Sequence, residues 1–266
     1  MTKFKLIAAD IDGTLLDDTY RVRPELLAAI EKCRNRGIDL VLATGRLYPS
    51  ALTYVKELGV TLPVIASNGA VVKDPVTGEL LYHVAVDRDY AAEALRLTRT
   101  DTAQRFVNIR DKFYTDAPEE MSRKYAEALK IDFIRVMPLE DVLTEDPTMV
   151  VIRDREDEIA RLTELLRQEL GDKVYLANSK PFFLDINNRH ISKGAALTRL
   201  CQKLKIDVSE VIGIGDGWND LEMFRVVGMG AAVANAPDRL KKSADYTCTL
   251  PSYQGVIEVI EKYLLD

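Results

Sequence analysis

The chain has 266 residues, of which 47% are hydrophobic and 29% are charged, and its formal net charge is −6. This composition is typical of a globular protein with enough apolar material for one large domain or two smaller ones. The acidic balance, without a Lys/Arg cluster, argues against nucleic acid as a partner, and the lack of a long apolar run argues against a membrane.

The first predicted element is a strand over residues 6–9, Leu-Ile-Ala-Ala, whose apolar run is typical of a strand buried on both faces of a parallel sheet. Asp10 and Asp12 follow at once, and Gly13 lets the backbone turn sharply. Ligands bind at the carboxyl ends of strands in open α/β sheets. The two aspartates therefore indicate a site, although a strand that ends in a solvated turn explains the same residues.

Pro24 begins a predicted helix, which Gly37 ends. Residues 39–43 then form a second buried strand, and the polar residues Thr44, Gly45 and Arg46 follow it. Together these elements form a βαβ unit with a right-handed crossover.

A helix over 49–58, a strand over 63–66 and a hairpin over 70–86 come next. Between residues 84 and 188 the pattern is helix, strand pair, helix, strand, helix and strand pair, so we predict an inserted α+β cap domain with one antiparallel sheet. The remaining segments alternate, which predicts a Rossmann-like, doubly wound α/β core. The predicted core is formed by residues 1–83 and 189–266.

Two helix starts carry polar caps. Asp154 is suited to cap a helix that Gly171 ends, and Ser192 is suited to cap the next helix. Lys193 then lies in a first helical turn, where a cation opposes the helix dipole. Either Lys193 is solvated, or an anion sits beside it.

Residues 211–215 form another buried strand, and Asp216 and Asp220 repeat the pattern of acidic residues at a strand end. Asn219 or Asp220 is also suited to cap the helix that follows. Residues 228–233 are predicted to form the last core strand.

A parallel sheet would bring several of these polar groups to one edge: Asp10, Asp12, Thr44, Asp216 and Asp220, with Lys193 from a helix start. Carboxylates in such number share a small site only if a cation offsets their repulsion. Mg²⁺ prefers oxygen ligands and fits them, whereas zinc is disfavoured because these strand ends lack cysteine and histidine. Magnesium, an ammonium group and a hydroxyl together suit a phosphoryl group. One carboxylate can attack phosphorus while a second acts as acid and base, and Asp10 and Asp12 suit these roles.

The cysteines are few and far apart in the sequence, at positions 33, 201 and 248. They support neither a disulfide framework nor a zinc cluster, so a cytoplasmic protein is expected. We expect a monomer or small homo-oligomer whose partner is a small phosphorylated metabolite.

Four segments resemble the motifs of the haloacid dehalogenase superfamily, in the same order and spacing. They are Asp-Ile-Asp-Gly-Thr at 10–14, Ala-Thr-Gly-Arg at 43–46, Ser-Lys-Gly at 192–194 and Gly-Asp-Gly-Trp-Asn-Asp at 215–220. The insert resembles a type IIB (C2B) cap, and the Cof-like sugar-phosphate phosphatases are the most similar group.

This resemblance implies that Asp10 is the nucleophile and Asp12 the general acid and base. It implies that Mg²⁺ is held by Asp10, the Asp12 backbone carbonyl and Asp216, supported by Asn219 and Asp220. The implied phosphate ligands are Thr44, Gly45, Lys193, the Ile11 backbone amide and the Asn219 side chain. An aspartate two residues after the nucleophile is similar to the phosphatases and phosphomutases of the superfamily rather than to its dehalogenases.

Substrate choice is expected to lie in the insert. The candidates are the turn over 178–183 and the residues Arg189 and His190, although an ordinary surface charge also explains Arg189. Trp218 is expected to pack within the core rather than to face the cap.

The resulting prediction is a magnesium-dependent phosphatase that hydrolyses small phosphomonoesters, such as sugar phosphates, through an aspartyl-phosphate intermediate. A phosphomutase of the phosphomannomutase type is the alternative on the same scaffold. A non-catalytic phosphate-responsive module, similar to response-regulator receivers, ranks third, because receivers are shorter and need no cap.

Overall fold

The structure is a computed structural model that describes residues 3–129, 131–178 and 181–265. The chain divides into two compact units. The core unit contains the residues up to Arg46, Ala51–Leu81 and those from Ser192 onward, and the inserted unit contains Leu47–Ser50 and Tyr82–Ile191. Among the described residues, no helix is both long enough and apolar enough to span a bilayer.

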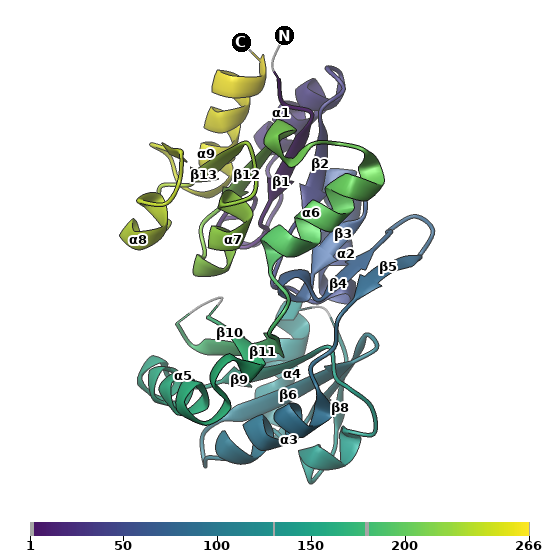
Figure 1. The fold of residues 1–266 in the computed structure, drawn as a ribbon, viewed down its shortest axis with the longest axis vertical. Coiled ribbons are helices and arrows are strands. Elements are labelled where there is room, and N and C mark those ends of the chain that lie inside the picture. Colours follow the sequence, from purple (N-terminus) through teal and green to yellow (C-terminus); the bar gives the residue numbers. More distant parts are fainter. Residues whose placement is uncertain (1–2, 130, 179–180, 266) are drawn as a thin grey trace. The chain divides into compact units, whose positions relative to one another are not determined.

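A parallel five-stranded sheet forms the centre of the core unit, in the order β14-β13-β12-β1-β2 (Figure 1). The strands are β1 (Leu6–Ala9), β2 (Asp39–Leu42), β12 (Val211–Gly215), β13 (Met229–Ala232) and β14 (Tyr246–Thr247). A parallel bridge from Ala43 to Ile65 continues this sheet to a three-stranded one. Its strands are β3 (Val64–Ala66), β4 (Val71–Lys73) and β5 (Leu80–His83). The predicted hairpin is therefore confirmed, whereas β14 shows that β13 is not the last strand of the sheet.

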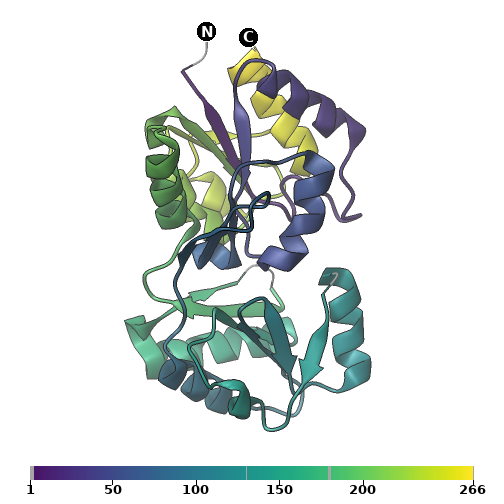
Figure 2. The same ribbon diagram turned by 90° about the vertical axis from the view of Figure 1, so that its right-hand side faces the viewer.

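Helices cover both faces of the core sheet, as Figure 2 shows. On one face α1 packs with α9, and on the other α6 packs with α7. The helices of this part are α1 (Pro24–Arg34), α2 (Tyr48–Leu58), α6 (Lys193–Leu204), α7 (Leu221–Phe224), α8 (Asp238–Lys241) and α9 (Ser252–Ile260). This arrangement confirms the predicted doubly wound α/β fold.

The inserted unit has one six-stranded sheet in the order β10-β11-β9-β6-β7-β8, antiparallel except for the parallel pair β7–β8. The strands are β6 (Gln104–Ile109), β7 (Lys112–Thr115), β8 (Phe133–Arg135), β9 (Met149–Arg153), β10 (Val174–Ala177) and β11 (Phe183–Asn188). The helices are α3 (Arg88–Leu97), α4 (Glu119–Leu129) and α5 (Glu156–Leu170). Two strands, β8 and β9, lie between α4 and α5, where the sequence pattern predicted one.

Each face of this sheet has its own apolar core. Leu95 of α3 and Leu162 of α5 pack with alternate residues of the central strands, such as Val150. On the other face Phe106 packs against Tyr125 of α4, with ring centres 4.9 Å apart and the rings tilted by 58°. The alternation of side chains along each strand thus assigns the helices to opposite faces.

The two predicted helix caps have different outcomes. Ser192 caps α6 as expected, because its Oγ accepts a hydrogen bond of 3.0 Å from the Ala195 amide. Asp154 does not cap α5, which begins at Glu156 after the N-cap residue Arg155. The Asp154 carboxylate instead accepts a 2.8 Å hydrogen bond from the Thr102 hydroxyl. Gly171 follows the last residue of α5, as predicted.

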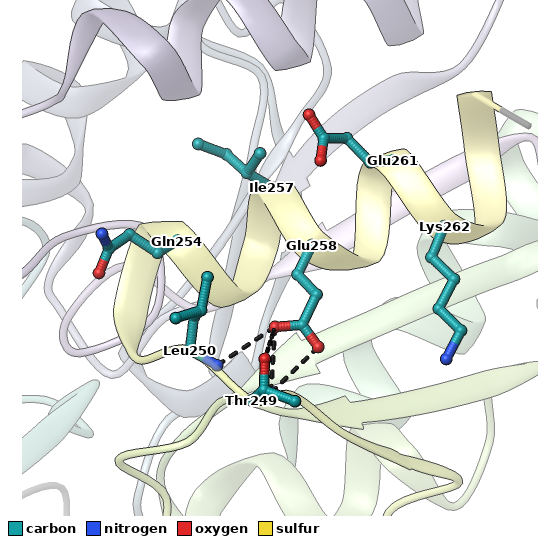
Figure 3. A pocket seen from close by; sticks show the side chains of 7 residues that line it. All are labelled: Thr249, Leu250, Gln254, Ile257, Glu258, Glu261 and Lys262. Atoms are coloured by element: carbon teal, nitrogen blue, oxygen red, sulfur yellow. Dashed lines mark hydrogen bonds between the residues drawn. The ribbon is translucent and has the colours of Figure 1, made fainter.

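A single carboxylate ties α9 to the loop that follows β14 (Figure 3). Glu258 accepts hydrogen bonds from the Thr249 hydroxyl at 2.8 Å, the Thr249 amide at 3.0 Å and the Leu250 amide at 3.2 Å. It also accepts one of 2.5 Å from the Tyr246 hydroxyl. Burial favours the neutral acid, but these donors outweigh it and lower the pKa of Glu258.

Candidate active site

Asp10 and Asp216 come together because they follow neighbouring parallel strands. Ala9 of β1 lies opposite Ile214 of β12, so the residues after the two strands share one edge of the sheet. Asp10, Asp216 and Asp220 each offer a carboxylate oxygen within 4.8 Å of the others. Gly13 has a φ of +75°, and a β-carbon there would collide with the Asp216 carboxylate. This close approach is the reason for glycine in the turn after Asp12.

Lys193 is fully buried in this acidic cluster. Its Nζ lies 3.0 Å from Asp10 Oδ2 and 2.7 Å from Asp220 Oδ1. Burial disfavours the ammonium ion, but the carboxylates of Asp10 and Asp220 outweigh it and raise the Lys193 pKa above its usual range. The solvated alternative is therefore wrong, and the anions beside this helix start are carboxylates.

The cluster holds more negative charge than Lys193 offsets. Burial raises the pKa of Asp10 to about 7, against the opposing effect of Lys193, and Asp220 and Asp12 add to the rise. Burial, followed by the charges of Asp10 and Asp220, raises the pKa of Asp216 to about 8. A divalent cation would relieve this repulsion, and the oxygen-only donor set fits Mg²⁺.

Asp220 organises the turn after β12 instead of capping α7. Its Oδ2 accepts hydrogen bonds from the Asp216 amide at 3.0 Å and the Gly217 amide at 2.9 Å, while Oδ1 pairs with Lys193. The helix α7 begins without a side-chain cap. The prediction that Asn219 or Asp220 caps this helix is therefore wrong.

Asn219, Thr44 and Gly45 lie together at a second point of the sheet edge. The Asn219 amide nitrogen donates a 2.9 Å hydrogen bond to Asn68 Oδ1, and the Asn68 backbone amide donates one of 3.0 Å to the Thr44 carbonyl. A β-carbon on Gly45 would lie 3.0 Å from Asn68 Oδ1. The Ile11 amide donates to Asp10 Oδ1 at 2.7 Å. The predicted phosphate ligands of the core unit thus occupy the same edge of the sheet as the acidic cluster.

Asp12 has a partner that we did not predict. Its carboxylate receives two hydrogen bonds from Arg46, from Nε at 2.6 Å and from Nη2 at 2.7 Å. The position of Arg46 directly after Thr44 and Gly45, at the end of the strand beside β1, was the available signal.

Three further polar residues at the site were also missed. The Thr14 hydroxyl donates a 2.9 Å hydrogen bond to Asp216 Oδ1. The side-chain amide of Asn235 donates one of 2.9 Å to the Gly13 carbonyl. Asn68, the second residue after β3, has a positive φ of 57°, and the Ser-Asn-Gly sequence there was the only hint of it. Asn235 lies after β13, where the sequence shows no acidic motif.

The residues proposed for substrate choice lie in the inserted unit. Arg189 is half-exposed, with its Nη2 4.0 Å from the exposed Asp172 carboxylate. His190 is exposed, and its amide donates to Asn188 Oδ1 at 2.9 Å. Within the predicted turn over 178–183, residues 179 and 180 lie outside the described part of the chain.

Trp218 is a partly exposed side chain of the core unit, so the predicted packing is only partial. The Arg239 guanidinium carbon lies 3.2 Å from the centre of its indole ring. The side chain remains 38% exposed, so this contact covers only part of it.

A model of the haloacid dehalogenase-like hydrolase family matches residues 7–260. The chain is 33% identical to a phosphoglycolate phosphatase of Archaeoglobus fulgidus, over 98% of this chain and 97% of that protein. The structure of a haloacid dehalogenase-like hydrolase from Bacteroides thetaiotaomicron is similar at 26% identity, with a TM-score of 0.85 over 97% of this chain and 99% of that one. A subclass IIB sugar phosphatase of the same superfamily shares the fold, at 21% identity and a TM-score of 0.82 over 97% and 98% of the two chains.

Proposed function

Because the chain belongs to the haloacid dehalogenase-like hydrolase family, we propose that it is a magnesium-dependent phosphatase acting through an aspartyl-phosphate intermediate. The observation that carries this proposal is the buried cluster in which Lys193 pairs with Asp10, beside Asp216, at the ends of two parallel strands. A buried ammonium group beside a carboxylate nucleophile suits a reaction that brings negative charge to that carboxylate. A relative named as a phosphatase supports the reaction class.

The proposed magnesium ligands are the carboxylates of Asp10 and Asp216 and the backbone carbonyl of Asp12. The raised pKa values of Asp10 and Asp216 support a cation between them, because Lys193 offsets only part of the negative charge of the cluster. When bound, Mg²⁺ supplies positive charge that offsets the charge of the phosphoryl oxygens.

In the proposed mechanism, the Asp10 carboxylate attacks phosphorus, and the bond from phosphorus to the ester oxygen breaks. Asp12 gives a proton to the departing oxygen and then takes one from the water that hydrolyses the aspartyl phosphate. The phosphoryl oxygens are held by Lys193, the Thr44 hydroxyl, the Asn219 side chain and the backbone amides of Ile11 and Gly45. Because Lys193 already pairs with Asp10, its ammonium group is positioned before the substrate arrives.

The proposed substrates are small phosphomonoesters such as sugar phosphates. We propose that residues 84–188 act as a type C2B cap that excludes water and selects the leaving group, with Arg189 and His190 as candidate contacts. The relative named as a phosphoglycolate phosphatase adds phosphorylated carboxylic acids to the substrates worth testing. A cytoplasmic location remains a prediction, which the three free and buried cysteines support.

The proposal is tested by measuring phosphate release from a panel of phosphorylated metabolites, with Mg²⁺ and with a chelator. We expect Mg²⁺-dependent hydrolysis that Asp10→Asn abolishes while the circular dichroism spectrum is unchanged. Wild-type rates in Asp10→Asn would overturn the proposal. An isomerised sugar phosphate in place of free phosphate would identify a phosphomutase, and binding of Mg²⁺ and phosphate without turnover would identify a phosphate-responsive module.

A further inference from the structure

Arg46 donates hydrogen bonds to both carboxylate oxygens of Asp12, which lies 34 residues earlier in the chain. Nε donates to Oδ2 at 2.6 Å and Nη2 donates to Oδ1 at 2.7 Å. The Arg46 side chain is only 7% exposed, against 23% for that of Asp12. A two-bond pair of this kind fixes the plane and direction of the carboxylate, which a single bond does not.

Both the backbone and the guanidinium group of Arg46 are held by neighbouring residues. Its amide donates a 3.0 Å hydrogen bond to the Thr44 hydroxyl, and its carbonyl accepts one of 2.8 Å from the Ser67 amide. The guanidinium carbon lies 4.9 Å from the centre of the Tyr54 ring and 5.8 Å from that of Tyr20. Such stacking restricts the movement of a guanidinium group. The partner of Asp12 is therefore a fixed group and not a mobile surface charge.

We propose that Arg46 is a positioning residue that holds the Asp12 carboxylate in place for proton transfer at the ester oxygen. This inference rests on the proposed function, in which Asp12 gives that proton. Asp12 lies on the turn after β1, where its side chain has staggered alternatives, and Arg46 selects one of them. Displacing a reacting group by about 1 Å costs on the order of 100-fold in rate. Loss of the Arg46–Asp12 hydrogen bonds is therefore expected to slow the proton-transfer step.

The leaving group separates positioning from other roles. An alkoxide leaves poorly without a proton, whereas p-nitrophenolate leaves readily as an anion. A residue that positions Asp12 is therefore important for alkyl phosphates and nearly irrelevant for p-nitrophenyl phosphate. A residue that binds the phosphoryl group affects both esters equally.

The experiment compares kcat/KM for p-nitrophenyl phosphate and for a hexose phosphate that the wild type hydrolyses. In Arg46→Met we expect a loss of about 100-fold for the hexose phosphate and less than about 3-fold for p-nitrophenyl phosphate. Arg46→Lys keeps the positive charge but cannot donate the two parallel hydrogen bonds of the guanidinium group. It should therefore retain part of the hexose phosphate activity that Arg46→Met loses. Asp12→Asn should show the same selectivity, and adding Arg46→Met to it should cost little more.

Arg23→Met is a matched control, because Arg23 also donates two hydrogen bonds to an aspartate, Asp17, and lies over an aromatic ring. This variant should leave both esters unaffected. Equal losses for the two esters in both Arg46 variants, or no loss in either, would overturn the inference while leaving the proposed function intact. A wild type that hydrolyses no ester of the metabolite panel would instead overturn the proposed function. Arg46→Lys keeps the test decisive if Arg46→Met fails to fold.

Discussion

Replacing Lys193 with Met tests the electrostatic structure of the site through stability alone. The substitution keeps an unbranched apolar stem in α6 but removes the only positive charge that the structure shows within 3.0 Å of both Asp10 and Asp220. Asp10 and Asp220 then lose their cationic partner while they stay buried, with 6% and 0% of their surfaces exposed. Removing one partner of a buried ion pair lowers the unfolding free energy by roughly 3–5 kcal/mol. A loss of that size lowers the unfolding midpoint by about 10 °C in a chain of this length.

The assay is thermal and urea unfolding of the metal-free protein, followed by tryptophan fluorescence. Trp218 is the single tryptophan of the sequence and lies in the core unit, so the signal reports the unit that contains the substitution. A probe local to one unit avoids mixing two transitions. The loss should shrink as the pH is lowered, because the orphaned carboxylates then take up protons.

Lys203→Met is the matched control in the same helix. The Lys203 side chain is 55% exposed, and its Nζ lies 3.4 Å from Glu79, so an effect within about 0.5 kcal/mol is expected. If Lys193→Met costs no more than Lys203→Met, the buried cluster is not held by charge, and the reasoning about the site is wrong.

Two further predictions concern pH and the C-terminal helix. Burial raises the pKa values of Asp10 to about 7 and Asp216 to about 8, so between about pH 4 and pH 8 these two carboxyl groups bind more protons in the folded protein than in the unfolded chain. The unfolding free energy of the metal-free protein should therefore fall as the pH rises, and Mg²⁺ should stabilise it more at pH 8 than at pH 5, which urea titrations would check. Glu258→Gln should lower the unfolding free energy by about 1–3 kcal/mol, because an amide nitrogen replaces one of the two oxygens that accept hydrogen bonds from four donors, including the Tyr246 hydroxyl. The lowered pKa of Glu258 means that this stabilisation fades as the pH falls, so calorimetry should find the variant and the wild type closer together in acid, and equal Tm differences at all pH values would refute the explanation.

Sequence patterns predicted the parts of the fold that depend on local chemistry. The apolar run over 6–9 and the acidic residues after it mark a buried strand and its functional end. The cap at Ser192 and the glycine at 171 mark helix ends, because side-chain and backbone preferences act within a few residues. The recurrence of acidic residues after β12 then placed Asp216 beside Asp10, since neighbouring parallel strands end at the same edge.

The partners of these groups were harder to predict, because they come from distant parts of the chain. Arg46 donates hydrogen bonds to Asp12, which is 34 residues away in the sequence. Asn219 donates one to Asn68, which is 151 residues away. No local preference encodes such pairs. Asp154 shows the opposite error, in which a good cap residue is used elsewhere because the Thr102 hydroxyl lies within reach. Local propensity is then overridden by a tertiary contact.

Trapping the covalent intermediate would establish whether Asp10 is the nucleophile. The enzyme is mixed with a substrate that carries a labelled phosphoryl group, quenched in acid during steady turnover, and digested for mass spectrometry. We predict that the label is found on the Asp10 side chain, that it disappears when unlabelled substrate is chased in before the quench, and that it is absent from Asp10→Asn. Steady phosphate release without label on Asp10, or with label on another residue, would rule out Asp10 as the nucleophile.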